Sequence, residues 1–377
     1  MRAFTFKGLF LTAVFMLLGC LSIQAADDDL ITKQITIKLD KAGTLPDRIT
    51  SSKKYKITNL KIIGEINGTD FRMIREMAGS DYYGGSTEGN LSVLDLSEAK
   101  IVIGGGDCFN GYSCYTSNDV IGNRAFSGCS RLTSLTLPAS ITRIGDDAFC
   151  CCSGLTSLTL PAGITEIGYG AFWGCSGLTS LNLPAGITSI GDDAFYGCSG
   201  LTSITLPAGI TEIGGSAFNG CSRLTSLTLP AGITSIGGGA FYGCSGLTSL
   251  NLPAGITEIG GGAFGFCSGL TSINLPAGIT SIGEYAFYGC SGLTSVTLPA
   301  GITEIGECAF YGCSGLTSLT LPVGLTQIDD YAFSECSGLT SIYVYAEKVP
   351  KIGEDVFTGC DAKKCTVYVP KGTYDDY

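Results

Sequence analysis

The stretch of sequence that decides the fold repeats itself every 23 residues. Residues 132–154 read LTSLTLPASITRIGDDAFCCCSG, residues 155–177 read LTSLTLPAGITEIGYGAFWGCSG, and residues 178–200 read LTSLNLPAGITSIGDDAFYGCSG. The pattern continues through nine units of equal length and a tenth with one inserted residue. The units begin at Leu132, Leu155, Leu178, Leu201, Leu224, Leu247, Leu270, Leu293, Leu316 and Leu339. A fixed period of this length is typical of a solenoid built from stacked repeats.

Each unit combines a short strand with a return segment. In residues 178–200, Leu181 faces the core while Ser180 and Asn182 face outward, which is the alternation of a half-buried β-strand. Pro184 has no amide N–H and ends the strand. One unit cannot bury its own apolar face, whereas stacked units cover one another. We therefore predict an α/β-type repeat solenoid with a parallel strand ladder, little helix and capped ends, which rises about 4.8 Å per unit and extends on the order of 50 Å.

The segments on either side of the array predict caps. We expect a signal peptide at 1–25, an N-terminal cap at 26–90, a divergent first repeat with an inserted loop at 91–131, the repeat array at 132–360, and a C-terminal cap strand and tail at 361–377. Within the N-terminal cap, Ile35 to Leu39 alternates like a strand, and Asp70 to Met77 has the pattern of a short helix.

The N-terminus predicts export, by one of two routes. Arg2 and Lys7 form a positive region ahead of an apolar run, Leu9 to Leu18, that is too short to span a bilayer. Cleavage after the small residue Ala25 gives a secreted chain. Alternatively, the sequence before Cys20 resembles a bacterial lipobox, and lipidation of Cys20 would attach the chain to a membrane. Both routes place the protein at the cell surface or outside the cell.

The composition excludes several classes of function. Only 15% of the residues are charged, and the formal net charge of −11 lacks the basic footprint that nucleic acid or an anionic membrane surface requires. The chain contains no histidine, the commonest general base and metal ligand, and no nucleophile elbow or phosphate-binding loop. We therefore predict a protein that is not an enzyme, with no cofactor, no metal and no nucleic-acid partner.

Most of the cysteines follow the repeat. Eleven of the 18 occupy the same position in successive units. They are Cys129, Cys152, Cys175, Cys198, Cys221, Cys244, Cys267, Cys290, Cys313, Cys336 and Cys360. Stacked units would place them about 4.8 Å apart, whereas a disulfide needs Cβ atoms at about 3.5–4.5 Å, and a line of thiols does not converge on a metal ion. We predict a column of buried thiols that pack as small apolar groups.

The cysteines outside this column leave alternatives open. Cys108 could pair with Cys114 in the inserted loop, and Cys360 could pair with Cys365 near the end of the chain. We expect the three others at surface-facing positions: Cys150, Cys151 and Cys308.

Because the core positions hardly vary between units, a ligand surface must use the positions that point outward. The strand face carries uncharged hydroxyl and amide groups suited to many weak hydrogen bonds, although a solvated face without a ligand is equally consistent with the pattern. Its candidate residues are Ser180, Asn182, Ser249, Asn251, Ser272 and Asn274.

A second candidate surface follows the repeated phenylalanine, where the next residue is often aromatic. Aromatic side chains are enriched in the hot spots of protein interfaces, although the pattern favours the alternative that they pack over the repeat turn against their neighbours. The residues at this position are Trp173, Tyr196, Tyr242, Tyr288 and Tyr311.

Acidic residues also recur, but we interpret them as solvated. Glutamates alternate with serines in successive units, which we attribute to duplication of a two-unit block: Glu166, Glu212, Glu258 and Glu304. The acidic pairs at 146–147 and 192–193 are isolated and do not supply the several oxygens that calcium requires.

The combination ITxIGxxAFxGCSxLTSLxLP, together with LSVLDLSEAKIV at 91–102 and TVYVPKGTYDDY at 366–377, resembles the BspA-like leucine-rich repeats of bacterial cell-surface proteins. This resemblance implies leucine-rich repeats of 23 residues, export and display on the cell surface. In some members it implies binding to host extracellular proteins such as fibronectin or fibrinogen. It transfers no binding residue, because the family has no fixed binding motif. It also implies further residues after Tyr377, and both a fragment and a chain without a C-terminal sorting element stay open.

These observations together predict adhesion. We expect an exported repeat protein that recognises host or neighbouring-cell surface proteins or glycans through its repeat surface, with a membrane contact only through a lipid anchor. The alternative is a non-binding structural spacer or a self-assembling surface scaffold, which the near-identity of the units favours. Neither the ligand nor the oligomeric state follows from the sequence.

Overall fold

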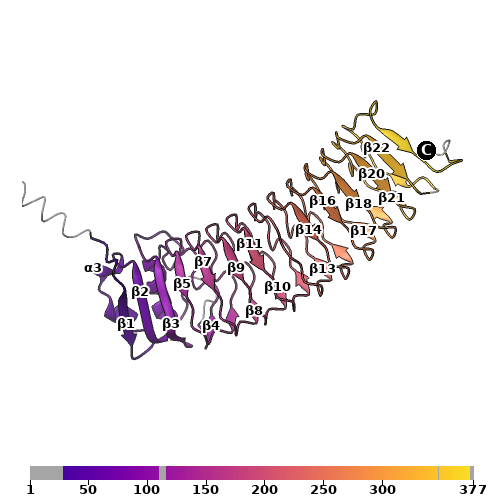
Figure 1. The fold of residues 1–377 in the computed structure, drawn as a ribbon. Helices are drawn as coiled ribbons and strands as arrows, with labels where there is room; N and C mark the ends of the chain where they lie inside the picture. Colours follow the sequence, from indigo (N-terminus) through magenta and orange to yellow (C-terminus); the bar gives the residue numbers. More distant parts are fainter. Residues whose placement is uncertain (1–28, 110–115, 347, 374–377) are drawn as a thin grey trace, which may run out of the picture.

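The computed structural model describes residues 29–109, 116–346 and 348–373. The chain winds into a parallel-strand solenoid of about 14 turns, about 23 residues apart, with 5% helix, which confirms the predicted fold class. Figure 1 shows the turns stacked into one curved rod, with β1 near one end and β22 near the other. The predicted signal peptide at 1–25 and the lipidation candidate Cys20 lie outside the described residues.

One side of the solenoid carries the strands that the repeat pattern predicted. They are β1 (Ile35–Leu39), β2 (Asn59–Ile66), β3 (Val93–Ile101), β5 (Ser134–Thr136), β7 (Ser157–Thr159), β9 (Ser180–Asn182), β11 (Ser203–Thr205), β14 (Ser249–Asn251), β16 (Ser272–Asn274), β18 (Ser295–Thr297), β20 (Ser318–Leu321), β22 (Ser341–Val344) and β24 (Thr366–Tyr368). All pair in parallel, in the orders β1-β2-β3-β5-β7-β9-β11, β14-β16-β18 and β20-β22-β24. We call this the first ladder.

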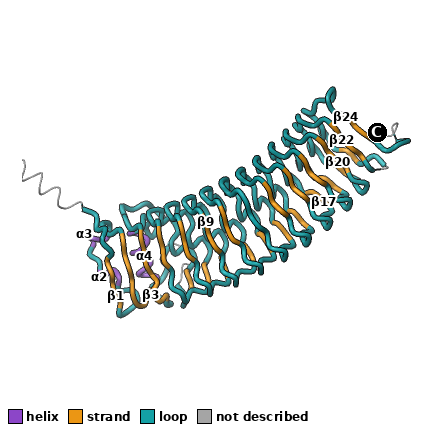
Figure 2. Tube along the Cα trace, viewed as in Figure 1, coloured by secondary structure: helices purple, strands orange, loops and turns teal. Residues whose placement is uncertain are grey.

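A second parallel ladder, which the sequence analysis did not predict, lies on the return segment. Its strands are β4 (Val120–Ile121), β6 (Arg143–Ile144), β8 (Glu166–Ile167), β10 (Ser189–Ile190), β12 (Glu212–Ile213), β13 (Ser235–Ile236), β15 (Glu258–Ile259), β17 (Ser281–Ile282), β19 (Glu304–Ile305), β21 (Gln327–Ile328) and β23 (Lys351–Ile352). They pair as β4-β6-β8, β10-β12-β13-β15 and β17-β19-β21-β23. Figure 2 shows both sets of short strands along the rod. A strand of two residues is too short to show an alternation of apolar and polar positions, so the sequence pattern did not reveal this ladder.

A third line of backbone hydrogen bonds joins neighbouring turns at the Ala-Phe segment. The Phe218 N–H donates to the Ala240 carbonyl at 2.7 Å, and the same bond recurs in the other turns of the array. It is most useful where the first ladder is interrupted. The unit that begins at Leu224 has no assigned strand in the first ladder, where an isolated bridge between Thr228 and Asn251 replaces strand pairing with the next unit. The second ladder and the Ala-Phe bonds keep the turns together there.

The core contains a continuous column of phenylalanine rings. Neighbouring rings are stacked with centroids 5.1–5.6 Å apart and planes within 1–10° of parallel. The column consists of Phe126, Phe149, Phe172, Phe195, Phe218, Phe241, Phe264, Phe287, Phe310, Phe333 and Phe357. Almost all of these rings have no exposed surface. Each ring therefore fills space that its own turn and the next turn share.

The cysteine column has the predicted character of free thiols and lies beside these rings. Ten of its members are buried and Cys360 is partly buried. From Cys152 to Cys336, each thiol donates a hydrogen bond to the carbonyl of a phenylalanine 26 residues earlier, at 3.0–3.3 Å. The thiols thus satisfy carbonyls on the neighbouring turn, a role beyond the apolar packing that the sequence predicted.

The N-terminal end of the phenylalanine column is covered by a helix. The helices within the described residues are α2 (Leu45–Arg48), α3 (Ser51–Lys54) and α4 (Gly68–Met77). The Asn67 side chain accepts from the Thr69 N–H at 3.0 Å, and the Asp70 carboxylate accepts from the Asn67 N–H at 2.9 Å, which forms a capping box at the start of α4. Phe71 of α4 packs edge to face against Phe126 at 5.4 Å. The predicted helix is confirmed and begins two residues earlier than expected, at Gly68.

Removal of one ring from the middle of the column tests its contribution to stability. We expect Phe218→Ala to lower the free energy of unfolding by about 3–5 kcal/mol, because neither neighbouring turn can move into the cavity without breaking its own stack. Ser203→Ala, on the exposed strand face, should change it by less than about 0.5 kcal/mol. Chemical denaturation followed by circular dichroism measures both; equal values for the two variants would contradict the role assigned to the column.

The thiol column predicts a loss of stability in alkaline solution. Burial raises the pKa of the Cys198, Cys244 and Cys290 thiols from 9.0 to about 12. Between these values the unfolded chain has lost protons that the folded chain retains, so the folded state becomes less favourable as the pH rises. We expect the free energy of unfolding to fall from about pH 9 upward. In the triple Cys→Ala variant of these positions the fall should be shallower; identical pH profiles would refute the assignment.

Candidate functional site

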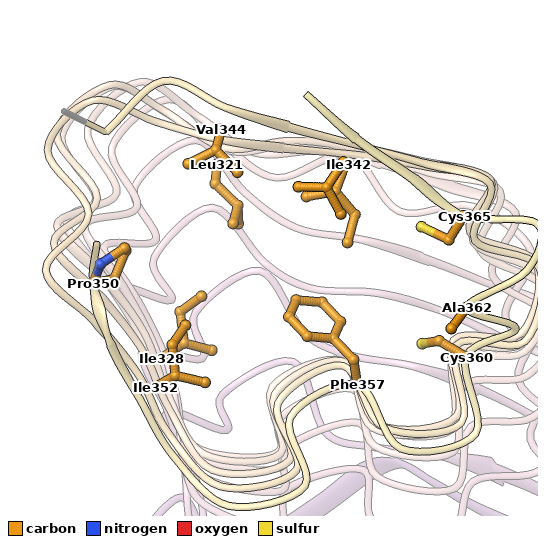
Figure 3. A pocket seen from close by; sticks show the side chains of 11 residues that line it. Leu321, Ile328, Ile342, Val344, Pro350, Ile352, Phe357, Cys360, Ala362 and Cys365 are labelled. Carbon is orange, nitrogen blue, oxygen red and sulfur yellow. The ribbon is translucent and has the colours of Figure 1, made fainter. Parts of the chain in front are cut away.

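The two surfaces proposed from the sequence lie on opposite sides of each turn. Figure 3 shows Ile342, from the first ladder, and Phe357, the last ring of the phenylalanine column, pointing toward each other across the interior. The outward residues of the strands and the aromatic residues that follow each phenylalanine therefore face away from one another. A single partner domain of ordinary size would contact one surface or the other.

The strand face is exposed and uncharged, and some of its hydroxyl groups already form hydrogen bonds within the protein. In most units the first threonine donates its hydroxyl to the backbone of the preceding turn, as Thr179 does to the Thr156 carbonyl at 3.3 Å. The predicted residues Ser180, Asn182, Ser249, Asn251, Ser272 and Asn274 are all exposed on β9, β14 and β16. Strand pairing brings Ser249 and Asn251 beside Ser272 and Asn274.

Several acidic side chains form hydrogen bonds or ion pairs with neighbouring turns of the solenoid. An Asp192 carboxylate oxygen accepts from the Gly215 N–H of the next turn at 2.6 Å, and Asp147 pairs with Arg124 at 3.0 Å. Glu166 is exposed and pairs with Arg143 at 3.0 Å. In the part of the chain that the structure describes, no group of three or more cysteine, aspartate or glutamate side chains is placed to hold a metal ion.

The core is open at the C-terminal end of the described chain. A cavity of about 320 Å³ lies between the last turns, lined mainly by apolar side chains that include Ile328, Ile352 and Phe357 (Figure 3). Small-molecule sites combine an apolar wall with a few convergent polar groups. The residues that line this cavity supply only two thiols, those of Cys360 and Cys365. We interpret the cavity as the uncovered end of the core.

The disulfide that the sequence left open between Cys360 and Cys365 does not form, since both are free thiols. Cys360 continues the thiol column and donates weakly to the Phe333 carbonyl at 3.5 Å. Cys365 precedes β24, whose register against β22 is offset by 25 residues, from Ser341 to Thr366, instead of 23. The final turn therefore contains two residues more than the 23-residue repeat, whereas the sequence analysis predicted one inserted residue.

The other cysteines are placed as follows. The prediction that Cys308 faces the surface is wrong, because the side chain is only 8% exposed and lies against Tyr285 of the preceding turn. Cys150 is half-buried and Cys151 is exposed. Cys108 is disulfide-bonded. Its predicted partner, Cys114, lies outside the described residues.

The predicted aromatic residues form two separate groups. Trp173 and Tyr196 are in contact, with ring centroids 4.7 Å apart. Asn219 takes the aromatic position in the next unit and ends this pair. Beyond it, rings touch one another over four consecutive turns, at 5.0–5.8 Å. This second group, which we call the aromatic strip, consists of Tyr242, Phe266, Tyr285, Tyr288 and Tyr311.

Two members of the aromatic strip were missed by the sequence analysis. Phe266 is 44% exposed and bridges Tyr242 at 5.3 Å to Tyr288 at 5.2 Å. Tyr285 is 40% exposed and lies 5.8 Å from Tyr288. The signal for Phe266 was present in the sequence, because its unit reads AFGFCSG where its neighbours read AFYGCSG. The aromatic residue has moved by one position.

Both missed residues occupy backbone positions that favour glycine. Phe266 has a φ of 55°, and the corresponding residue of the preceding unit is Gly243. Tyr285 has a φ of 56°, and the residue of the preceding unit there is Gly262. A side chain in this left-handed region costs roughly 1–2 kcal/mol. Large apolar side chains are thus exposed at two places where the fold alone would favour glycine.

Acidic groups border the aromatic strip. The Tyr285 hydroxyl donates to the Glu307 carboxylate at 3.1 Å, and this hydrogen bond raises the pKa of Tyr285 to about 12. Glu284, next in sequence to Tyr285, is also exposed. The strip therefore presents ring edges and hydroxyls beside negative charge.

Comparisons with known proteins agree with the fold. The family model described as BspA type leucine rich repeat region (6 copies) matches residues 108–221, 165–293 and 262–373. A leucine-rich repeat protein from Bacteroides ovatus is 26% identical, with a TM-score of 0.58 and 84% of each chain covered. A leucine rich cell surface protein from Faecalibacterium prausnitzii is 27% identical, with a TM-score of 0.49, covering 91% of this chain and 89% of that one. No match was found among curated proteins. Within the described residues, no helix has the length and apolar character needed to cross a membrane.

Restoring glycine at the left-handed positions tests whether the strip costs stability. We expect Glu335→Gly, at the position that corresponds to Phe266 but outside the strip, to raise the free energy of unfolding by about 1 kcal/mol, because its φ of 59° is strained for glutamate. Phe266→Gly gains the same relief but loses ring contacts, so its net change should stay within about 1 kcal/mol of zero. Thermal and chemical unfolding measure both. A loss above about 3 kcal/mol in Phe266→Gly would mean that this ring is a core residue.

Proposed function

The chain belongs to the family of BspA-type leucine-rich repeat proteins, and we propose that it acts outside the cell as an adhesive protein that binds another protein through the aromatic strip. Export depends in this proposal on residues 1–25, with or without lipidation of Cys20. In this proposal residues 26–90 cap the start of the array at 132–360, and residues 361–377 cover its end only in part. The chain has no catalytic role in this proposal, in keeping with a solenoid family that is generally non-enzymatic.

The observation that carries the proposal is the exposure of contiguous aromatic side chains at strained positions. Tyrosine and other large aromatic residues dominate the energetics of protein interfaces. A strip that served only to cover its own turn would use glycine at the Phe266 position, as Gly243 and Gly289 do in the neighbouring units. Strained backbone at a surface is more often found where a partner binds. Phe266 and Tyr285 fit that description.

The ring geometry favours a protein over a glycan. Sugars stack on exposed ring faces, whereas Tyr288 and Tyr311 are stacked on each other at 5.0 Å with planes 8° apart. Phe266 stands edge to face with both Tyr242 and Tyr288. The strip consequently offers edges and hydroxyls, which suit the mixed apolar and polar surface of a protein.

The charge around the strip indicates the chemistry of the partner. Glu284 and Glu307 are exposed beside Tyr285, and the whole chain carries a formal net charge of −11. A partner with lysine or arginine around an apolar centre would complement this surface and would associate faster at low salt. The strand face, with Ser249, Asn251 and their neighbours, offers a second and weaker contact surface on the opposite side.

Binding of the full chain to a panel of immobilised extracellular-matrix proteins tests this proposal. We expect saturable binding that weakens with salt, and a dissociation constant at least about tenfold higher for Phe266→Gly and for Tyr285→Asp, because each removes an exposed ring of the strip. Aspartate is the residue at the Tyr285 position in other units, such as Asp193, so this variant keeps the fold.

Matched controls come from the same two columns outside the strip. Glu335→Gly corresponds to Phe266→Gly, and Tyr331→Asp corresponds to Tyr285→Asp; both should bind like the unchanged chain. Equal loss in controls and strip variants would remove the strip from the proposal. Binding only to a glycan array would replace the protein partner, and the absence of any binding would favour the structural spacer.

A further inference from the structure

One unit of the array carries cysteine at two adjacent positions where the other units do not. Residues 132–154 end in CCCSG where the unit at 178–200 ends in YGCSG. Cys150 thus takes the aromatic position, Cys151 takes the position of the left-handed glycine, and Cys152 belongs to the buried thiol column. The Sγ atoms of Cys150 and Cys151 lie 3.4 Å apart.

The two neighbouring thiols differ in their surroundings. Cys151 is exposed and has a φ of 59°, the value at which other units have glycine. Cys150 is half-buried, and burial raises the pKa of its thiol to about 12. Cys152 is fully buried and donates to the Phe126 carbonyl at 3.0 Å, so it does not compete for either neighbour. Glycine would serve the turn better than Cys151 does, so the fold itself does not account for this cysteine.

We propose that Cys150 and Cys151 form a reversible oxidation site, which closes into a disulfide between adjacent residues when it reacts with a low-molecular-weight disulfide. Two features of the geometry support this. The sulfur atoms are already next to each other, and one of them is open to solvent. The proposal does not depend on the binding function of the aromatic strip.

The reaction proceeds by two exchanges. The exposed Cys151 thiolate attacks one sulfur of the reagent; a bond forms to Cys151, the sulfur–sulfur bond of the reagent breaks, and one thiolate leaves. Cys150 then gives up its proton and attacks the Cys151 sulfur, and the second thiolate of the reagent leaves. Two protein thiols lose two electrons and two protons to become one disulfide, and the reagent is reduced to two thiols.

The product should be easy to reduce. The Cα atoms of adjacent residues joined by a trans peptide bond are about 3.8 Å apart, whereas disulfides usually join Cα atoms 4.4–6.8 Å apart. The strain of the small ring raises the reduction potential, so the bond should respond to the thiol balance around the protein instead of acting as a permanent brace.

The chain contains its own reporter of this reaction. Trp173 is the single tryptophan of the sequence. Its carbonyl accepts a hydrogen bond from the Cys151 N–H at 2.6 Å, and its ring contacts Tyr196. A disulfide at 150–151 lies on the adjacent turn and should quench tryptophan fluorescence, with recovery on reduction.

The experiment uses the full chain carrying Cys360→Ser and Cys365→Ser, which removes the other partly exposed free thiols among the described residues. It is treated with oxidised glutathione and then alkylated after unfolding. Chymotrypsin cuts after Phe149 and Tyr169, so one peptide holds Cys150, Cys151 and Cys152 alone. After oxidation we expect this peptide to lack two hydrogens and to carry one alkyl group, on Cys152. If dithiothreitol is added before alkylation, the peptide should carry three alkyl groups, and the tryptophan fluorescence should recover to the same extent.

The Cys150→Ser variant is the matched control. It should stop at the mixed disulfide, with one glutathione attached to Cys151. The proposal would be overturned by any of three results in the parent chain: a stable glutathione adduct at Cys151, a dimer linked through Cys151, or full alkylation of all three cysteines after oxidation.

Discussion

The whole structure depends on one constraint: every inward side chain must fit against its own copy in the next turn. Parallel backbone pairing sets the distance between turns, and the phenylalanine rings, at 5.1–5.6 Å, are stacked at nearly that distance. A side chain that does not fit in one turn therefore also disturbs the packing of the two neighbouring turns. This explains why the core positions scarcely vary, and why the thiols of the cysteine column find a hydrogen-bond acceptor at the same place in each turn, as Cys244 does on Phe218.

The same constraint makes departures from the repeat informative. Where a position is set by packing, it recurs; where it changes, packing did not demand it. Phe266, Tyr285 and Cys151 each take a left-handed backbone position at which the preceding unit has glycine. These are the residues on which the proposed interface and the proposed oxidation site depend. In a repetitive protein the exceptions to the consensus are better candidates for function than its most regular columns.

The sequence was sufficient for the parts of the structure that repeat. The period, the strand of each unit, the thiol column and the helix near Asp70 all follow from spacing and polarity. The second ladder was missed because two residues cannot show a period. The aromatic strip was predicted only in part, because Phe266 lies one position away from the column of aromatic residues that follow each phenylalanine. The exposure of Cys308 was predicted wrongly, because a ring of the preceding turn covers this side chain. Contacts between turns decide all three features, and a single unit does not contain them.

The three lines of hydrogen bonds between turns also determine how the rod would respond to a pulling force. Each turn is held mainly by its two neighbours, so a load applied at one end would detach the outermost turn before it disturbed the interior. A detached unit of 23 residues could extend to roughly 75–80 Å, many times its thickness in the stack. A tethered rod of this design would lengthen in nearly equal steps under shear and could rewind when the load fell. The repetition of nearly equal units would thus make the rod extensible in a stepwise and reversible way.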